Sequence, residues 1–152
     1  MLITHLNRLP DHAQVLPIFN RANKPVASAA YVREHKDAFD GRLENTRLLH
    51  DASMQAWEDW FAVAGFRPKR FTHGPVFPDF NYLFAAVLAG QGVALCPVEV
   101  FGWEIARGDL VVLSDIATCT DESYYIVTTE RRPPAVTQFV KWFAKRVSEP
   151  LV

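Results

Sequence analysis

The segment from Ala85 to Pro97, AAVLAGQGVALCP, places a small-residue, helix-like run directly before Gly90 and a second apolar run directly after Gly92. Gly90 lies where a helix would end, because glycine takes the left-handed conformation at low cost. We expect Gly92 to loosen the turn, Val93–Leu95 to form a short buried strand, and Pro97 to end it. Phosphate-binding loops have the opposite order, since their glycines lie between a strand and the helix that follows. The segment therefore predicts a helix-to-strand connector in an α/β sheet.

Strand-like and helix-like segments alternate along the rest of the chain. Apolar residues from Trp57 to Ala64 follow helix spacing, Ser53 is placed to cap this helix, and Gly65 is placed to end it. Strands are expected at Leu2–Thr4, Ala13–Phe19, Thr46–His50, Arg70–Gly74, Gly108–Leu113 and Ser123–Thr129, and further helices at Asp79–Ala89 and from Pro134. This alternation predicts a mainly parallel, right-handed α/β sheet.

Composition excludes several classes of protein. The chain has 152 residues, enough for one domain of ordinary size or two small lobes, and a net charge of -1, which gives no electrostatic footprint for nucleic acid. The basic clusters Arg67–Arg70 and Arg131–Pro134 are short and indicate solvated loops. No segment approaches the length of a membrane span, and two cysteines give neither a disulfide framework nor metal-ligand spacing. We therefore expect a cytoplasmic protein without a cofactor.

Two strand-to-helix turns carry the candidate binding residues. The turns are His50–Ser53 and His73–Phe80, and each would lie at the carboxyl end of a strand, where α/β sheets bind ligands. If the two strands are neighbours, both turns share one edge, and each offers the free N–H groups of a helix start. The candidate effector-binding residues are His50, Asp51, Ser53, Trp57, Phe77 and Asp79.

Each candidate also has a purely structural interpretation. Asp79 fits a helix N-cap, and Trp57 fits an apolar stripe facing a core. A metal site built from His50, Asp51, His73 and Asp79 would suit a small hydrolase, but this spacing matches no compact ligand motif. Cys96 lies in an apolar strand with no flanking charge, which indicates a buried and unreactive thiol.

Taken in order, seven segments resemble one protein family over nearly the whole chain, from about Leu2 to about Trp142. They are LLHD, WEDWFAVAG, GPVFPD, AAVLAGQGVALCP, EIARGDLVVL, YYIVTT and VTQFVKWF. The chain resembles the effector-binding domain of LysR-type transcriptional regulators, in the branch that contains the glycine-cleavage activator and the β-lactamase regulator. The Trp-x-x-Trp helix and the Gly-x-Gly-Val-Ala-Leu-x-Pro block together carry most of the specificity.

The resemblance implies an α/β fold like that of type 2 periplasmic binding proteins, with two lobes joined by two crossing strands. On that template, residues 1–20 are a first-lobe strand and the first crossing, 21–122 the second lobe, and 123–152 the return crossing and the final helix of the first lobe. The family's helix-turn-helix, its linker helix and most of the first lobe have no counterpart in the sequence. We expect a chain truncated at its N-terminus, with no DNA-reading helix and no direct contact with nucleic acid.

The resemblance also implies a function. The chain would be the ligand-sensing and oligomerisation part of a regulator, binding a small polar effector between two lobes, and it would not be an enzyme. The alternative is a truncated interaction module that pairs with a full-length regulator. A homodimer or higher oligomer is expected, because the final helix carries the apolar residues Phe139, Val140, Phe143 and Val147 with little of the first lobe to cover them.

Overall fold

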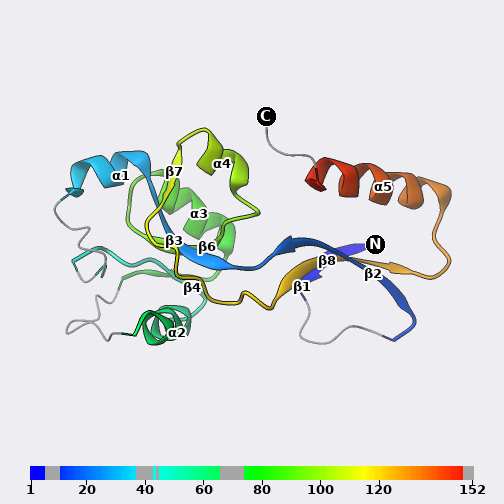
Figure 1. The fold of residues 1–152 in the computed structure, drawn as a ribbon, viewed down its shortest axis with the longest axis horizontal. Coiled ribbons are helices and arrows are strands. Elements are labelled where there is room, and N and C mark those ends of the chain that lie inside the picture. Colours follow the sequence, from blue (N-terminus) through cyan, green and yellow to red (C-terminus); the bar gives the residue numbers. More distant parts are fainter. Residues whose placement is uncertain (6–10, 37–42, 44, 66–73, 149–152) are drawn as a thin grey trace. The chain divides into compact units, whose positions relative to one another are not determined.

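The polypeptide forms two compact units in a computed structural model that describes residues 1–5, 11–36, 43, 45–65 and 74–148. Unit 1 contains Met1–Arg21 together with Cys119–Val152, and unit 2 contains Ala22–Thr118 (Figure 1). Unit 2 is therefore one continuous stretch of chain, whereas unit 1 is assembled from two stretches that are far apart in the sequence.

The sheet of unit 2 contains one strand that runs against the others. Strand β3 (Asn23–Ser28) lies between β6 (Ala94–Pro97) and β7 (Leu110–Val112) and pairs antiparallel with both. Strands β4 (His50–Asp51) and β5 (Val76–Phe77) pair in parallel, and a parallel bridge between Leu48 and Val93 connects this pair to the start of β6. Strands β4, β5, β6 and β7 thus run in one direction and β3 runs in the other.

The expectation of a mainly parallel sheet is therefore wrong for the β3 ladders, although β4 and β5 are parallel as expected. Strand β3 is the first strand of unit 2 and leads directly into helix α1 (Ala29–Glu34). Its partners β6 and β7 come from much later segments, so the residues next to β3 in the sequence do not indicate whether the pairing is parallel or antiparallel. The expected strand Thr46–His50 is reduced to the Leu48 bridge and β4. Of the expected strand Arg70–Gly74, only Gly74 lies within the described residues.

Two apolar clusters cover the two faces of this sheet. Neighbouring residues of a strand point to opposite faces, so Ala27 faces one cluster and Val26 the other, and Leu95 and Cys96 divide in the same way. Helix α2 (Gln55–Ala64) covers the first face, and helices α3 (Phe80–Leu88) and α4 (Gly102–Ala106) cover the second (Figure 1). The unit is a three-layer α/β/α arrangement built on a small sheet.

The helix-to-strand connector has the predicted form, with one difference. Gly90 follows α3 and adopts a left-handed conformation with φ +73°, as its sequence position predicts. Gly92, which was expected to loosen the turn, is buried, and a Cβ atom added to it would lie 2.3 Å from the carbonyl oxygen of Arg47. Gly92 is therefore needed for a close approach between two backbone segments, not for flexibility.

Unit 1 is a small antiparallel sheet covered by the last helix. Its strand order is β1 (Leu2–His5), β8 (Ser123–Thr129), β2 (Ala13–Asn20), with β8 in the centre. Helix α5 (Pro134–Ser148) begins at the predicted proline and buries Val140 at 6% exposure, whereas Trp142 on another face is 57% exposed. Helix α5 therefore has one packed face and one open aromatic face.

Replacing Trp60 with alanine should destabilise the protein by about 3–5 kcal/mol, because the side chain is fully buried beside Trp57 and Phe61. Its indole N–H also donates a 2.9 Å hydrogen bond to the carbonyl of Ile116. The free energy of unfolding in urea measures the change. Val63→Ala is the matched control, since Val63 lies on the same helix with 62% of its surface exposed, and it should change stability by less than about 0.5 kcal/mol. Equal stabilities of the two variants would contradict the assigned core.

Candidate functional site

The parallel pairing of β4 and β5 places the two candidate turns side by side. His50 is in register with Val76, and Asp51 with Phe77. The His50 amide donates to the carbonyl of Pro75 at 3.0 Å, and the Ala52 amide donates to the carbonyl of Phe77 at 2.9 Å. Residues of the two predicted turns thus pair directly and share one edge of the sheet, whereas of the predicted strand Arg70–Gly74 only Gly74 lies within the described residues.

The first turn has an unusual backbone. Ala52 adopts a positive φ of +51°, a conformation that non-glycine residues rarely take, and the Ser53 amide donates to the carbonyl of Asp51. Ser53 lies two residues before α2, and its hydroxyl accepts a 3.3 Å hydrogen bond from the amide of Gln55, the first residue of the helix. The N-cap position itself is Met54, which makes no side-chain cap bond. The helix therefore begins one residue later than predicted, and Ser53 supports its start from the residue before the N-cap.

The second turn ends in a conventional helix cap. Asp79 is the N-cap of α3, and its carboxylate accepts a 2.7 Å hydrogen bond from the amide of Asn81. This carboxylate is exposed, so the cap leaves part of its surface open to a ligand. Phe77, two residues earlier, is half-buried against the apolar cluster that contains Leu83 and Val87.

Burial divides the six sequence-predicted residues into two groups. Asp51, Ser53 and Asp79 are exposed and Phe77 is half-buried, all on the shared edge. His50 is fully buried, and Trp57 is 1% exposed with its indole N–H donating to the carbonyl of Leu49 at 2.9 Å. Both side chains are thus buried next to the edge, and the Trp57 bond fixes the backbone just before the first turn. His73, which the alternative metal site requires, lies outside the described residues.

The charge of Asp51 on the shared edge affects a cysteine of strand β6, Cys96. Burial raises the pKa of the Cys96 thiol well above its usual range, and the negative charge of Asp51 raises it further. The thiol is fully buried, in agreement with the sequence-based prediction. Within the ranges that the structure describes, no three His, Cys, Asp or Glu side chains come together in a way that could hold a metal ion.

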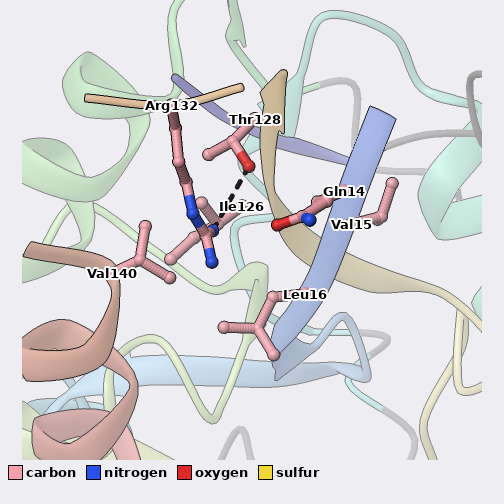
Figure 2. A pocket seen from close by; sticks show the side chains of 7 residues that line it. All are labelled: Gln14, Val15, Leu16, Ile126, Thr128, Arg132 and Val140. Carbon is pink, nitrogen blue, oxygen red and sulfur yellow. Dashed lines mark hydrogen bonds between the residues drawn. The ribbon is translucent and has the colours of Figure 1, made fainter. Parts of the chain in front are cut away.

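A hollow that the sequence did not predict lies in unit 1. It is a cavity of about 370 Å³ lined by Gln14, Val15, Leu16, Ile126, Thr128, Arg132 and Val140 (Figure 2). Arg132 belongs to the short basic cluster before α5, whose sequence predicted a solvated loop. The sequence position of Arg132 could have suggested a role in a site, because Arg132 lies between the end of the central strand β8 and the proline that starts α5.

Comparison with known proteins decides the family. Residues 1–148 match the family model described as the LysR substrate binding domain. The chain belongs to this family. The predicted resemblance, which rested on short motifs, is thereby confirmed over almost the whole chain.

The relatives of this LysR substrate-binding domain are named as regulators. It is 32% identical over 105 residues to the HTH-type transcriptional activator AmpR of Citrobacter koseri, which covers 68% of this chain and 36% of that protein. It is 34% identical over 104 residues to the HTH-type transcriptional regulator TrpI of Pseudomonas aeruginosa, which covers 66% of this chain and 35% of that protein. The domain therefore spans little more than a third of the length of these relatives.

Solved structures confirm the fold. The AmpR effector binding domain from Citrobacter freundii superposes with a TM-score of 0.73 at 22% identity, over 95% of this chain and 72% of that chain. The regulatory domain of CrgA from Neisseria meningitidis gives a TM-score of 0.69 at 16% identity, over 96% of this chain and 74% of that chain. The predicted α/β fold of the periplasmic-binding-protein type is thus correct. Among the described helices, none has the length and apolar character needed to cross a membrane.

Cys96 should resist a thiol reagent in the folded protein. Its raised pKa leaves less of the reactive thiolate at any pH, and its burial excludes the reagent. In a Cys119→Ser variant, which leaves Cys96 as the sole cysteine, reaction with DTNB at pH 8 should occur only after denaturation. The converse variant, Cys96→Ser, keeps the half-buried Cys119 and reports the reactivity of an ordinary site. Rapid native labelling of Cys96 would contradict the assigned environment.

Proposed function

We propose that this chain is the effector-sensing part of a LysR-type transcriptional regulator and that it acts in the cytoplasm by binding rather than by catalysis. The observation that carries the proposal is the family match over residues 1–148. It is supported by relatives named as transcriptional regulators, which include AmpR and the glycine cleavage system transcriptional activator of Escherichia coli, the latter 29% identical over 110 residues. In this proposal unit 2 corresponds to the second lobe, and unit 1 to part of the first lobe with the crossing strands.

We place the effector contacts on the shared edge of the turns that follow β4 and β5. Helices α2 and α3 both begin at this edge, and helix starts favour negative or strongly polar groups. The exposed carboxylates of Asp51 and Asp79 repel a simple anion and favour a positively charged group. A ligand with both kinds of group, such as an amino acid or a sugar-peptide conjugate, satisfies both requirements.

The six candidate residues would take different roles in this site. Asp51, Ser53 and Asp79 would contact the ligand through polar groups, and Phe77 would contact it through its ring. His50 and Trp57 would act from below, because each is almost fully buried and holds the first turn in place. Ala52, held at a positive φ, would fix the backbone of the turn that carries Asp51 and Ser53.

Ser53→Ala and Asp79→Asn should each weaken effector binding by about tenfold, the usual loss for one hydrogen bond to a charged group. Asparagine is itself a good N-cap, so Asp79→Asn removes the charge while keeping the start of α3 intact. Calorimetry with a panel of amino acids and sugar-peptide conjugates measures the affinity. Glu58→Gln is the control, since Glu58 is exposed in the first turn of α2 but away from the turn residues. Unchanged affinity in both site variants would place the effector elsewhere.

We further propose that the chain forms a homodimer through uncovered apolar helix faces. On α5, Trp142 is 57% and Phe139 37% exposed, and their rings lie 5.8 Å apart. Helix α3 has no charged residue between Phe80 and Leu88, and Tyr82 and Leu88 on it are 67% and 41% exposed. Closed twofold pairing covers an apolar surface with the same surface of a second copy. A full-length regulator would be the competing partner.

The chain should behave as a dimer in light scattering at micromolar concentration, and Phe139→Glu should convert it to a monomer, because a buried unpaired charge opposes association. Gln138→Glu introduces the same charge at the exposed neighbouring position and should leave the dimer intact. A monomeric parent protein would contradict the proposal of self-association and leave a full-length regulator as the partner to be tested by mixing.

A further inference from the structure

The cavity in unit 1 is built on one face of its sheet. Gln14 of β2 is in register with Thr128 of β8, and Leu16 of β2 is in register with Ile126 of β8. These two cross-strand pairs form adjoining parts of one wall, because residues two apart in a strand point to the same face. Val140 of α5 adds an apolar group to the lining (Figure 2). All of these residues belong to unit 1.

Arg132 supplies a cation to this cavity. Its guanidinium donates a long 3.4 Å hydrogen bond to the hydroxyl of Thr128, which is 5% exposed (Figure 2). Among the residues that the structure describes, no carboxylate pairs with it. Arg21 and Arg107 differ in this respect, since they pair with Glu122 and Asp109. A half-buried guanidinium without a counter-ion attracts an anion.

The rest of the lining restricts what that anion can be. Leu16, Ile126 and Val140 give the cavity apolar walls, and Gln14 adds an amide group beside them. An inorganic anion would satisfy the guanidinium but leave these walls unused, whereas a neutral apolar molecule would leave the cation without a partner. The volume of about 370 Å³ lies within the range of small-molecule sites, about 300–1,000 Å³.

We propose that this cavity binds a small monocarboxylic acid with a short apolar body, its carboxylate on Arg132 and its apolar body against Leu16, Ile126 and Val140. The site is in a different unit from the edge formed by β4 and β5 and does not depend on the function proposed for that edge. The chain would therefore carry two ligand sites of different chemistry, one for a mixed polar effector and one for an amphipathic acid.

Calorimetry on the complete chain with hexanoate as the probe tests the proposal. Hexanoate should bind saturably at millimolar concentration, whereas 1-hexanol, which keeps the apolar body, and inorganic phosphate, which keeps only the charge, should each bind at least about tenfold more weakly. The absence of saturable hexanoate binding would overturn the proposal. Equal binding of hexanol or of phosphate would also overturn it, because the site would then be an apolar void or a simple anion site.

Variants locate the binding. Arg132→Gln should weaken hexanoate binding by about tenfold or more, and Arg132→Lys should weaken it less, because lysine keeps the charge but not the planar fork of guanidinium donors. Arg131→Gln is the matched control, since it removes the same charge from the neighbouring exposed position and should leave affinity unchanged. Leu16→Trp, which fills the cavity from its exposed rim, should abolish binding and keeps the test valid if Arg132→Gln does not fold. Equal affinities of the Arg132→Gln and Arg131→Gln variants, or undiminished binding to Leu16→Trp, would place hexanoate outside this cavity.

Discussion

The position of the candidate effector site depends on two backbone hydrogen bonds around Val93. The Val93 amide donates to the carbonyl of Arg47 at 2.9 Å, and the Leu49 amide donates to the carbonyl of Val93 at 2.8 Å. They join the short β4–β5 pair to the sheet formed by β6, β3 and β7. The close approach is possible because residue 92 has no side chain, since a Cβ there would collide with the Arg47 carbonyl. The indole N–H of Trp57 in α2 also donates a hydrogen bond to the carbonyl of Leu49. The polar edge is thus anchored by backbone contacts and the α2 core.

Much of unit 2 could be predicted because its signals are local. The aromatic spacing of α2, the left-handed Gly90 and the N-cap at Asp79 each follow from a few adjacent residues, and all three are found in the structure. The direction of β3 could not be predicted in this way. Its sequence carries no mark of the partners on either side, which come from segments about seventy and eighty-five residues later in the chain. The role of Gly92 was missed for the same reason, since its neighbour Arg47 is distant in sequence.

The candidate sites show the same division between local and distant information. The turns after β4 and β5 were identified because each combines polar residues with a helix start, and their adjacency follows from the general behaviour of α/β sheets. The cavity beside Arg132 was not identified. Its walls come from β2, β8 and α5, and the sequence gives no indication that Gln14 would face Thr128. A basic residue in a loop is usually solvated, so only the three-dimensional arrangement distinguishes Arg132 from Arg131.

The discontinuity of unit 1 has a consequence for the order in which the protein folds. Strand β8 lies between β1 and β2, so neither N-terminal strand gains its hydrogen-bonding partner until residues 123–129 have left the ribosome. Unit 2 is continuous from Ala22 to Thr118 and is complete before that point. During synthesis the α/β unit can form before β8 pairs with β1 and β2. Closing this sheet joins residues more than a hundred positions apart, and contacts of such long range slow folding.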